Sequence, residues 1–314
     1  MSPRKKNTLT DRKTTEMEKA QLSDILSYLS FRQYQIRYHV EDFIEIREYF
    51  GSLLHASLGP ALKQTCNSTL FNRVKGPFTG GNLFESLYSP TISEGHPLKN
   101  RFKEGIHLPY VISLPEFMRQ LYVPGDEICI SLTLIGHAIS SLPVFINAFE
   151  IMGQNAFGLG KGMAYLHQVD EGICWFPGME YDLPKLNQNT SMHFVTPLSL
   201  SGMEGNLPSF QKIYSNLFER CYFLSHFHCG QQGYKNPTLP LATGNEIELV
   251  SGSFNAYTYG RYHGSKAQKT SLSGWQGYLN FKGDFEPYSA LMQIGKYLHL
   301  GGKTGFGFGH YQLK

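Results

Sequence analysis

The sequence predicts an α+β protein made of two tandem ferredoxin-like (RRM-like) βαββαβ modules with glycine-rich loops. Two observations predict this fold. Strand and helix patterns recur in the same order in both halves of the 314-residue chain, which is long enough for two ordinary domains. Each half also carries a loop of the form G-x-G-x-G, made by Gly158, Gly160 and Gly162 and by Gly305, Gly307 and Gly309.

The first half begins with FRQYQIRYHV (31–40), where apolar and polar residues alternate as in a half-buried strand. The segment after it, which contains SLLHASLGPALKQ, has its apolar residues at helical spacing. A strand is expected at His107–Ser113, then a strand at 127–136, a helix at 141–153 with proline near its first turn, and a strand at 163–169. These elements complete one βαββαβ unit.

The second half repeats this order. MHFVTPLSL (192–200) reads as a strand and LPSFQKIYSNLFERCYFLSHF (207–227) as a helix with one apolar stripe. Further strands are expected at Glu248–Tyr259, 275–281 and 310–313, with a helix at 285–300 before the last of them.

The domain organisation follows from these patterns. Residues 29–175 form an N-terminal ferredoxin-like domain with an insertion at 66–105 that is rich in Gly, Pro, Ser and Asn, and residues 185–314 form a C-terminal one. Residues 1–28 have many basic and few apolar side chains, so we expect a disordered basic arm.

Composition bounds the location and the partners. The basic arm lacks the apolar run of a signal peptide, and no stretch reaches the ~18 apolar residues of a membrane span. The five cysteines are widely spaced, which is typical of a reduced chain. We therefore expect a cytoplasmic protein with no membrane partner. The net charge of +3 is only a mild indication of an anionic partner.

The terminal loop GGKTGFGFG approximates three known motifs. A phosphate-binding P-loop would need glycine where Tyr297 stands, and a dinucleotide-binding loop would follow a strand and open a helix. The RNA-recognition strand K/R-G-F/Y-G/A-F is echoed loosely, with phenylalanine rings for base stacking and Lys303 for phosphate. The alternative is a glycine turn that lets a helix pack tightly on the sheet.

Residues 274–313, GWQGYLNFKGDFEPYSALMQIGKYLHLGGKTGFGFGHYQL, resemble the C-terminus of the CRISPR-associated endoribonucleases that process precursor CRISPR RNA. This is the sixth Cas family, within the RAMP superfamily. Three other stretches fit the same family: LLHASLGPALKQ, YVPGDEICISLTLIGHAISSLPVFINAFEIMGQNAFGLGKG and MHFVTPLSL. The resemblance covers most of the chain from Phe31 onward.

The resemblance implies a tandem ferredoxin-like fold that binds CRISPR repeat RNA and cuts precursor CRISPR RNA within the repeat. The ribose 2′-hydroxyl attacks the adjacent phosphate and leaves a 2′,3′-cyclic phosphate and a 5′-hydroxyl, without metal or other cofactor. The sequence shows no carboxylate cluster of the kind that holds Mg²⁺. Other Cas proteins of an effector or adaptation complex are implied as possible partners, and both a monomer and a homodimer stay open.

Such a reaction needs a base, an acid and a cation, and histidine suits proton transfer near neutral pH. The resemblance favours His55, because related enzymes place an active-site residue on the first long helix. His39 is the second candidate, with Tyr38 beside it to orient or protonate. Lys63, two turns after His55, is a candidate cation.

A separate set of residues is expected to bind RNA. It comprises Gly160 and Lys161 in the first glycine loop, Arg261, and Lys303, Gly305, Phe306, Gly307 and Phe308 in the second. Lys161 is also an alternative cation for the reaction. No metal site is expected, because only Cys66 falls where relatives carry a cysteine-rich patch.

Two other functions stay open on the sequence alone. A protein with this fold can bind repeat RNA without cutting it, as a catalytically inactive subunit of an effector or adaptation complex. A duplicated ferredoxin-like interaction protein that binds no RNA is the other. The basic arm and the lysines in both glycine loops argue against the latter.

Overall fold

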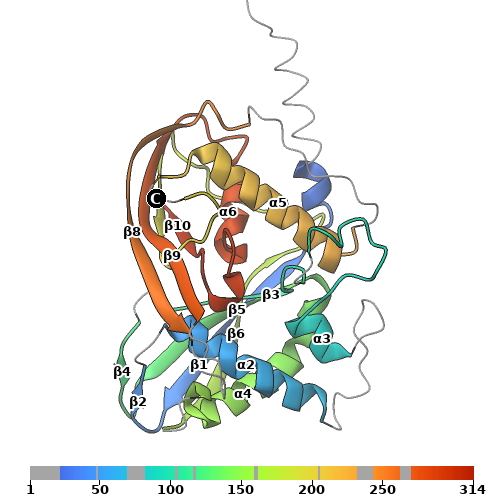
Figure 1. Cartoon of the computed structure of the whole chain (residues 1–314), viewed down its shortest axis with the longest axis vertical. Coiled ribbons are helices and arrows are strands. Elements are labelled where there is room, and N and C mark those ends of the chain that lie inside the picture. The colour runs from blue at the N-terminus through green and yellow to red at the C-terminus, as the bar shows by residue number, and fades with distance from the viewer. Residues whose placement is uncertain are drawn as a thin grey trace, which may run out of the picture.

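The computed structural model of the chain describes residues 22–46, 49–68, 82–102, 105–115, 118–158, 162–203, 206–231, 243–261 and 270–314. These residues form two four-stranded antiparallel sheets, each with its own pair of long helices. In Figure 1 the N-terminal unit lies below the C-terminal unit.

The N-terminal sheet has the strand order β3-β5-β1-β6. Its helices, α2 and α4, separate the strands in the chain order β-α-β-β-α-β, which is the ferredoxin-like arrangement. The elements are β1 (Phe31–Val40), α2 (Phe50–Cys66), β3 (Tyr110–Ser113), β5 (Glu127–Ile135), α4 (Leu142–Gln154) and β6 (Ala164–Trp175).

Shorter elements decorate this unit. Helix α3 (Leu83–Tyr88) lies within the stretch expected to be an insertion and packs beside α2, while β2 (Ile44–Glu45) pairs with β4 (Leu121–Tyr122). Two 3₁₀ turns, η1 (Gly136–Ser141) and η2 (Ala156–Gly158), flank α4.

The C-terminal sheet repeats the arrangement with the strand order β10-β7-β9-β8. Its elements are β7 (Asn189–Phe194), α5 (Phe210–His228), β8 (Glu248–Arg261), β9 (Thr270–Lys282), α6 (Ser289–Leu298), η3 (Thr304–Phe306) and β10 (Tyr311–Leu313). The tandem ferredoxin-like fold is thereby confirmed, and each predicted long strand and helix overlaps an observed one. The strand expected at 192–200 is displaced, because β7 ends at Phe194.

Strand β1 shows how each sheet separates a covered face from an open one. Tyr34, Ile36 and Tyr38 are buried toward the helices, whereas the intervening residues lie on the other face. The Tyr38 hydroxyl donates a hydrogen bond to the Phe149 carbonyl of α4 at 2.9 Å, which fixes this face under the helices.

The two cores interlock across the junction between the units. Leu272 and Phe308 of the C-terminal unit belong to the N-terminal core, and Phe31, Val111 and Ile135 of the N-terminal unit belong to the C-terminal core. The units are therefore packed together rather than merely linked. Among the described residues, no helix combines the length and the apolar character that a membrane crossing requires.

Candidate active site

His55 lies in the first half of helix α2, half-buried at the edge of the apolar stripe that α2 presents to the sheet. Leu54 and Leu58, on either side of it, are buried in the N-terminal core. The helical repeat places His55 about 100° around the helix axis from Leu54 and about 60° from Leu58, which puts it at the edge of the stripe.

Tyr88 at the end of α3 covers one face of the His55 ring. The two ring centroids are 5.2 Å apart with an interplanar angle of 21°, so the rings are stacked. The Tyr88 hydroxyl also donates to the backbone carbonyl of His55 at 3.1 Å. Tyr88 therefore holds both the ring and the helix backbone at this point.

The C-terminal unit supplies the other side. Phe306 in η3 places its ring edge against His55, with centroids 4.1 Å apart and an angle of 65°. A β carbon on Gly305 would lie 3.7 Å from Cε1 and 3.8 Å from Nδ1 of His55. The His55 ring thus lies where the terminal glycine loop meets α2, with groups from both halves of the chain around it.

Glycine at two positions lets the backbone of the loop approach closely, at Gly51 to the other unit and at Gly309 to the start of the loop itself. A β carbon on Gly51 would lie 2.0 Å from the Phe306 carbonyl oxygen, and one on Gly309 would lie 1.8 Å from the Leu300 carbonyl oxygen. Gly309 also has a φ of 76°, which side chains rarely adopt. The loop therefore packs tightly against α2 of the other unit and against its own start at Leu300. The alternative interpretation of GGKTGFGFG expected a different role, a glycine turn that packs a helix on the sheet.

The structure corrects the expectation for Phe308. It was expected to stack on RNA bases, but it is fully buried in the N-terminal core and meets the Tyr49 ring edge-on at 5.2 Å. Gly305 and Gly307 are also buried. Phe306 is half-buried, and its ring packs against the His55 ring.

The expected role of Tyr38 in orienting or donating a proton is corrected as well. Its side chain is fully buried beneath α4, and burial raises the pKa of its hydroxyl well above the ordinary value. A proton donor to RNA needs contact with the substrate, which this position does not give.

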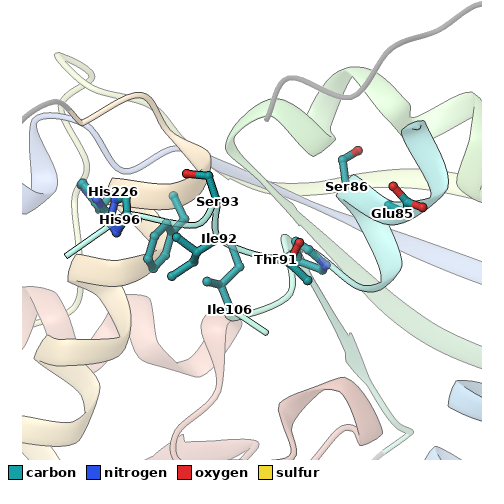
Figure 2. A pocket seen from close by; sticks show the side chains of 10 residues that line it. Glu85, Ser86, Thr91, Ile92, Ser93, His96, Ile106 and His226 are labelled. Carbon is teal, nitrogen blue, oxygen red and sulfur yellow. The ribbon is translucent and has the colours of Figure 1, made fainter. Parts of the chain in front are cut away.

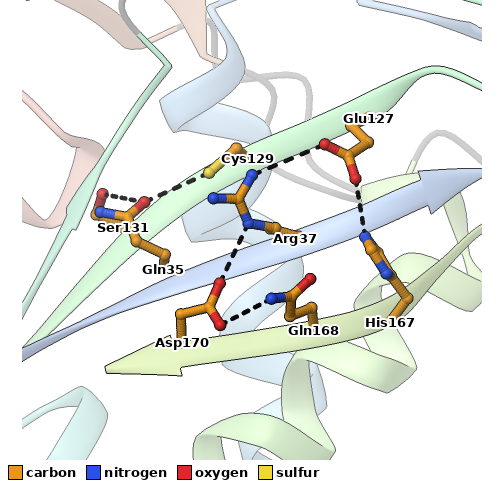
Figure 3. Close-up of polar contacts among 8 residues, drawn as sticks. All are labelled: Gln35, Arg37, Glu127, Cys129, Ser131, His167, Gln168 and Asp170. Carbon is orange, nitrogen blue, oxygen red and sulfur yellow. Dashed lines mark hydrogen bonds and ion pairs between the residues drawn. The ribbon is translucent and has the colours of Figure 1, made fainter. Parts of the chain in front are cut away.

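His39 faces the opposite side of the sheet from Tyr38, next to the rings of Tyr165 and His167 at 5.3 and 6.4 Å. Since α2 packs on the covered face, the structure does not bring His39 and His55 together. The polar network on the open face includes ion pairs from Arg37 to Asp170 and Glu127 (Figure 3).

The expected cations are spread over the molecule. Lys63 is exposed, eight residues beyond His55, which is about 12 Å along the helix axis. Lys303 donates through Nζ to the Ser273 carbonyl at 2.8 Å, and burial lowers the pKa of its amine.

Arg261 ends β8 opposite Thr270, and its side chain is outside the described part. Gly160 and Lys161 also lie outside the described residues.

A hollow of about 270 Å³ lies between one side of α3, the segment that follows this helix and the end of α5 (Figure 2). Glu85 and Ser86 of α3 line it together with Ile92, His96 and Phe227, among others. One short helix therefore borders both this hollow and the His55 ring. Among the described residues, no three His, Cys, Asp or Glu side chains converge as a metal site would require.

Comparison with known proteins gives two family matches. Residues 192–311 match the family of the CRISPR-associated endoribonuclease Cas6, and residues 29–174 match a family described as an N-terminal domain. No curated protein sequence matches the chain.

Solved structures share the fold. Thermus thermophilus Cas6 (TTHB231) in its product complex has 15% identity and a TM-score of 0.52, over 90% of this chain and 100% of that chain. A chain of a partial Cas6-RT-Cas1–Cas2 complex has 11% identity and a TM-score of 0.53, over 92% of this chain and 47% of that one. At these identities the likeness concerns the fold.

The C-terminal half therefore carries the Cas6 sequence pattern, and the whole chain carries the tandem fold of solved Cas6 proteins. The match of residues 192–311 and the shared fold support a CRISPR-associated protein of the Cas6 type.

Proposed function

We propose that this protein cuts precursor CRISPR RNA within the repeat by metal-independent transesterification, with His55 as the group that transfers a proton. The observation that carries the proposal is the position of His55, half-buried between α2, Tyr88 and the terminal glycine loop. A histidine held on two sides keeps its ring orientation, and proton transfer depends on that orientation.

In the proposed reaction the ribose 2′-hydroxyl loses its proton and its oxygen attacks the neighbouring phosphorus. The bond from phosphorus to the 5′-oxygen breaks, and that oxygen takes up a proton. The products are a 2′,3′-cyclic phosphate and a 5′-hydroxyl. His55 serves one of the two proton transfers, because imidazole exchanges protons near neutral pH.

The proposal includes CRISPR repeat RNA as the partner. The similar Thermus thermophilus chain was solved as a product complex, which supports this choice. For the cation that stabilises the phosphorane charge we keep Lys63 and Lys161 as candidates. Lys303 and Arg261 are proposed to contact the RNA backbone.

The alternative is a repeat-binding subunit that does not cut. Its support is the likeness to one chain of the Cas6-RT-Cas1–Cas2 complex, of which this protein spans about half the length. Within such an assembly the repeat could be held for other Cas proteins to act on.

One experiment separates the two functions. The purified protein is incubated with repeat RNA from the same genome in EDTA, and the product ends are analysed. Cleavage to a 2′,3′-cyclic phosphate supports the enzyme, whereas tight, salt-sensitive binding without cleavage supports the subunit. Neither binding nor cleavage with any repeat RNA of that genome would falsify the RNA function altogether.

A further inference from the structure

Arg220 in helix α5 is a buried arginine with incomplete pairing. Only 3% of it is exposed. Its Nε donates to the Leu298 carbonyl at 2.9 Å, and Nη1 lies 3.3 Å from Nδ1 of His107. The other amino nitrogen, Nη2, is buried and has no hydrogen-bond partner among the described residues.

This guanidinium is charged at neutral pH, because burial lowers the pKa of Arg220 only to about 10. No carboxylate within the described ranges lies at ion-pair distance from it; the nearest acidic residue in sequence, Glu219, pairs with Arg101 instead. Buried charges in proteins are normally paired. A counter-ion from outside the chain would complete this one.

Arg220 faces a hollow of about 180 Å³ between α5, the segment around His107 and the start of the terminal glycine loop. Arg101 and Glu219 stand at its rim, with side chains 43% and 36% exposed. The Asn216 side chain also lines it, and its oxygen already accepts from Gly301 N at 3.0 Å. The Arg220 charge is thus at the floor of a hollow whose rim is accessible.

The charges of the lining groups favour an anion. Two arginines and one glutamate give the hollow one net positive charge, since burial lowers the pKa of His107 well below its ordinary value and keeps it neutral. A guanidinium binds phosphate through parallel N–H donors, and Arg101, whose Nη2 pairs with Glu219, adds positive charge at the rim. The Glu219 carboxylate, held by Arg101, opposes the anion on one side only.

We propose that this hollow binds a phosphate group, and that the group is a phosphodiester of the RNA substrate next to the one that is cut. This rests on the proposed function. The same two chain segments border the hollow and the His55 ring: His107 is followed by Leu108, whose Cδ1 would lie 2.7 Å from a β carbon on Gly305. Gly301 begins the loop that ends on His55.

Phosphate contacts fix the register of a nucleic acid on a protein. An RNA strand that presents one phosphate to His55 and another to Arg220 is held at two points across the junction of the units. Arg220 would then be a positioning residue, which places the scissile bond without touching the reacting atoms.

The test measures binding of repeat RNA that carries a 2′-deoxy sugar at the cleaved position, so that binding is separated from cleavage. Arg220→Met should weaken binding about tenfold or more and lower the slope of log K against log salt by about one. The RNA affinity of Arg220→Lys should lie between those of the parent and Arg220→Met, because lysine keeps the positive charge but lacks the parallel N–H donors of the guanidinium. Lys212→Met, on the same helix two turns earlier, is the matched control and should bind like the parent.

A scan of RNAs with a single methylphosphonate then identifies the phosphate. One position should weaken binding by the parent protein and have no further effect on Arg220→Met. If Arg220→Met does not fold, as judged by thermal unfolding, the same scan with Arg220→Lys and the parent decides. Equal sensitivity at every position in the parent and in Arg220→Lys overturns the proposal.

Inorganic phosphate is the second probe and distinguishes a free anion from RNA. A site for free phosphate alone would raise the melting temperature of the parent more than chloride of equal ionic strength does, without any sensitive RNA position. That result overturns the RNA source. If His55→Ala abolishes cleavage while folded Arg220 variants bind and cut like the parent, the inference fails and the proposed function stands. If the parent neither binds nor cuts repeat RNA, the proposed function fails.

Discussion

Gly51 of helix α2 and Phe306 of the terminal glycine loop approach so closely that a β carbon at position 51 would lie 2.0 Å from the Phe306 carbonyl oxygen. The same hypothetical atom would lie 2.7 Å from Cε1 of Tyr49. The approach joins the two ferredoxin-like units beside His55, and five testable consequences follow from it and its surroundings.

Gly51→Ala should push the loop away from α2. Backbone atoms have little room to yield, so we expect a loss of about 1–3 kcal/mol in the free energy of unfolding and a lower cleavage rate. Urea unfolding and single-turnover cleavage measure the two effects. Gly260→Ala is the control, because a β carbon there meets nothing within 4 Å. Equal behaviour of the two variants would contradict the packing.

The two phenylalanines of the loop should differ in what they support. Phe308→Ala removes a ring from the N-terminal core and should cost about 3–5 kcal/mol in the free energy of unfolding. Phe306→Ala should cost less stability, because Phe306 is only half-buried, and should slow cleavage by releasing one side of the His55 ring. The reverse order of stabilities would place Phe308 outside the core.

His55→Ala should abolish cleavage while the affinity for repeat RNA stays within a few fold. The measurement is single-turnover cleavage together with binding of an uncleavable repeat. His39→Ala should cut at a rate near that of the parent, because His39 lies on the opposite face of the sheet from α2. If His39→Ala did not cut RNA while His55→Ala did, the reaction would have to be assigned to the open face of the sheet.

Tyr88 should act through its ring more than through its hydroxyl. Tyr88→Phe keeps the stack on His55 and loses one hydrogen bond to the His55 carbonyl, so its cleavage rate should fall only slightly. Tyr88→Ala loses both the ring stack and the hydrogen bond, and its cleavage rate should fall at least tenfold below that of Tyr88→Phe. A shift of the pH profile of cleavage in Tyr88→Ala would show that the stack affects the ionisation of His55, and rates equal to Tyr88→Phe would argue against any role of the ring.

The domain junction should lose stability in acid. Burial lowers the pKa of His228 to about 3 and that of His137 to about 4, whereas an unfolded histidine titrates near 6.5. Nε2 of His228 lies 2.7 Å from the His107 carbonyl and donates to it, so its Nδ1 accepts from His137 Nε2 at 3.2 Å. The neutral rings fit this chain of bonds.

As the pH falls from 6.5 toward 4, the unfolded chain therefore binds protons that the folded chain does not. The free energy of unfolding should drop by about 1 kcal/mol per pH unit for each of the two histidines. Urea unfolding at several pH values between 7.5 and 4.5 measures the slope. His228→Gln should be less stable at pH 7.5 but show a shallower slope, and an unchanged slope would exclude this histidine as its source.

Much of the fold could be predicted because strand alternation and helical spacing are local patterns. The two glycine loops, found at the same place in each half, indicated the duplication before any contact was known. The strand orders of the two sheets then follow from the ferredoxin-like arrangement.

The candidate site was harder to predict, because its contacts join segments far apart in the chain. Nothing local in FGFGHY distinguishes a ring that stacks on a ligand from one that fills the core of the other unit, so Phe308 was wrongly expected to face RNA. Tyr88 was missed because it lies in a segment read as an insertion without elements.

Arg220 was missed although its signal was present. It lies three residues after Leu217 and four before Leu224, inside the apolar stripe of α5. A charged residue at that spacing is unusual in a buried stripe and indicates a paired or ligand-bound charge.

The meeting of His55 with Phe306 also has a consequence for biosynthesis. The ribosome makes helix α2 early and the terminal glycine loop late, so a nascent chain has the histidine long before it has the loop that holds it. If His55 transfers the proton as proposed, cutting should begin only when the second unit has folded onto the first.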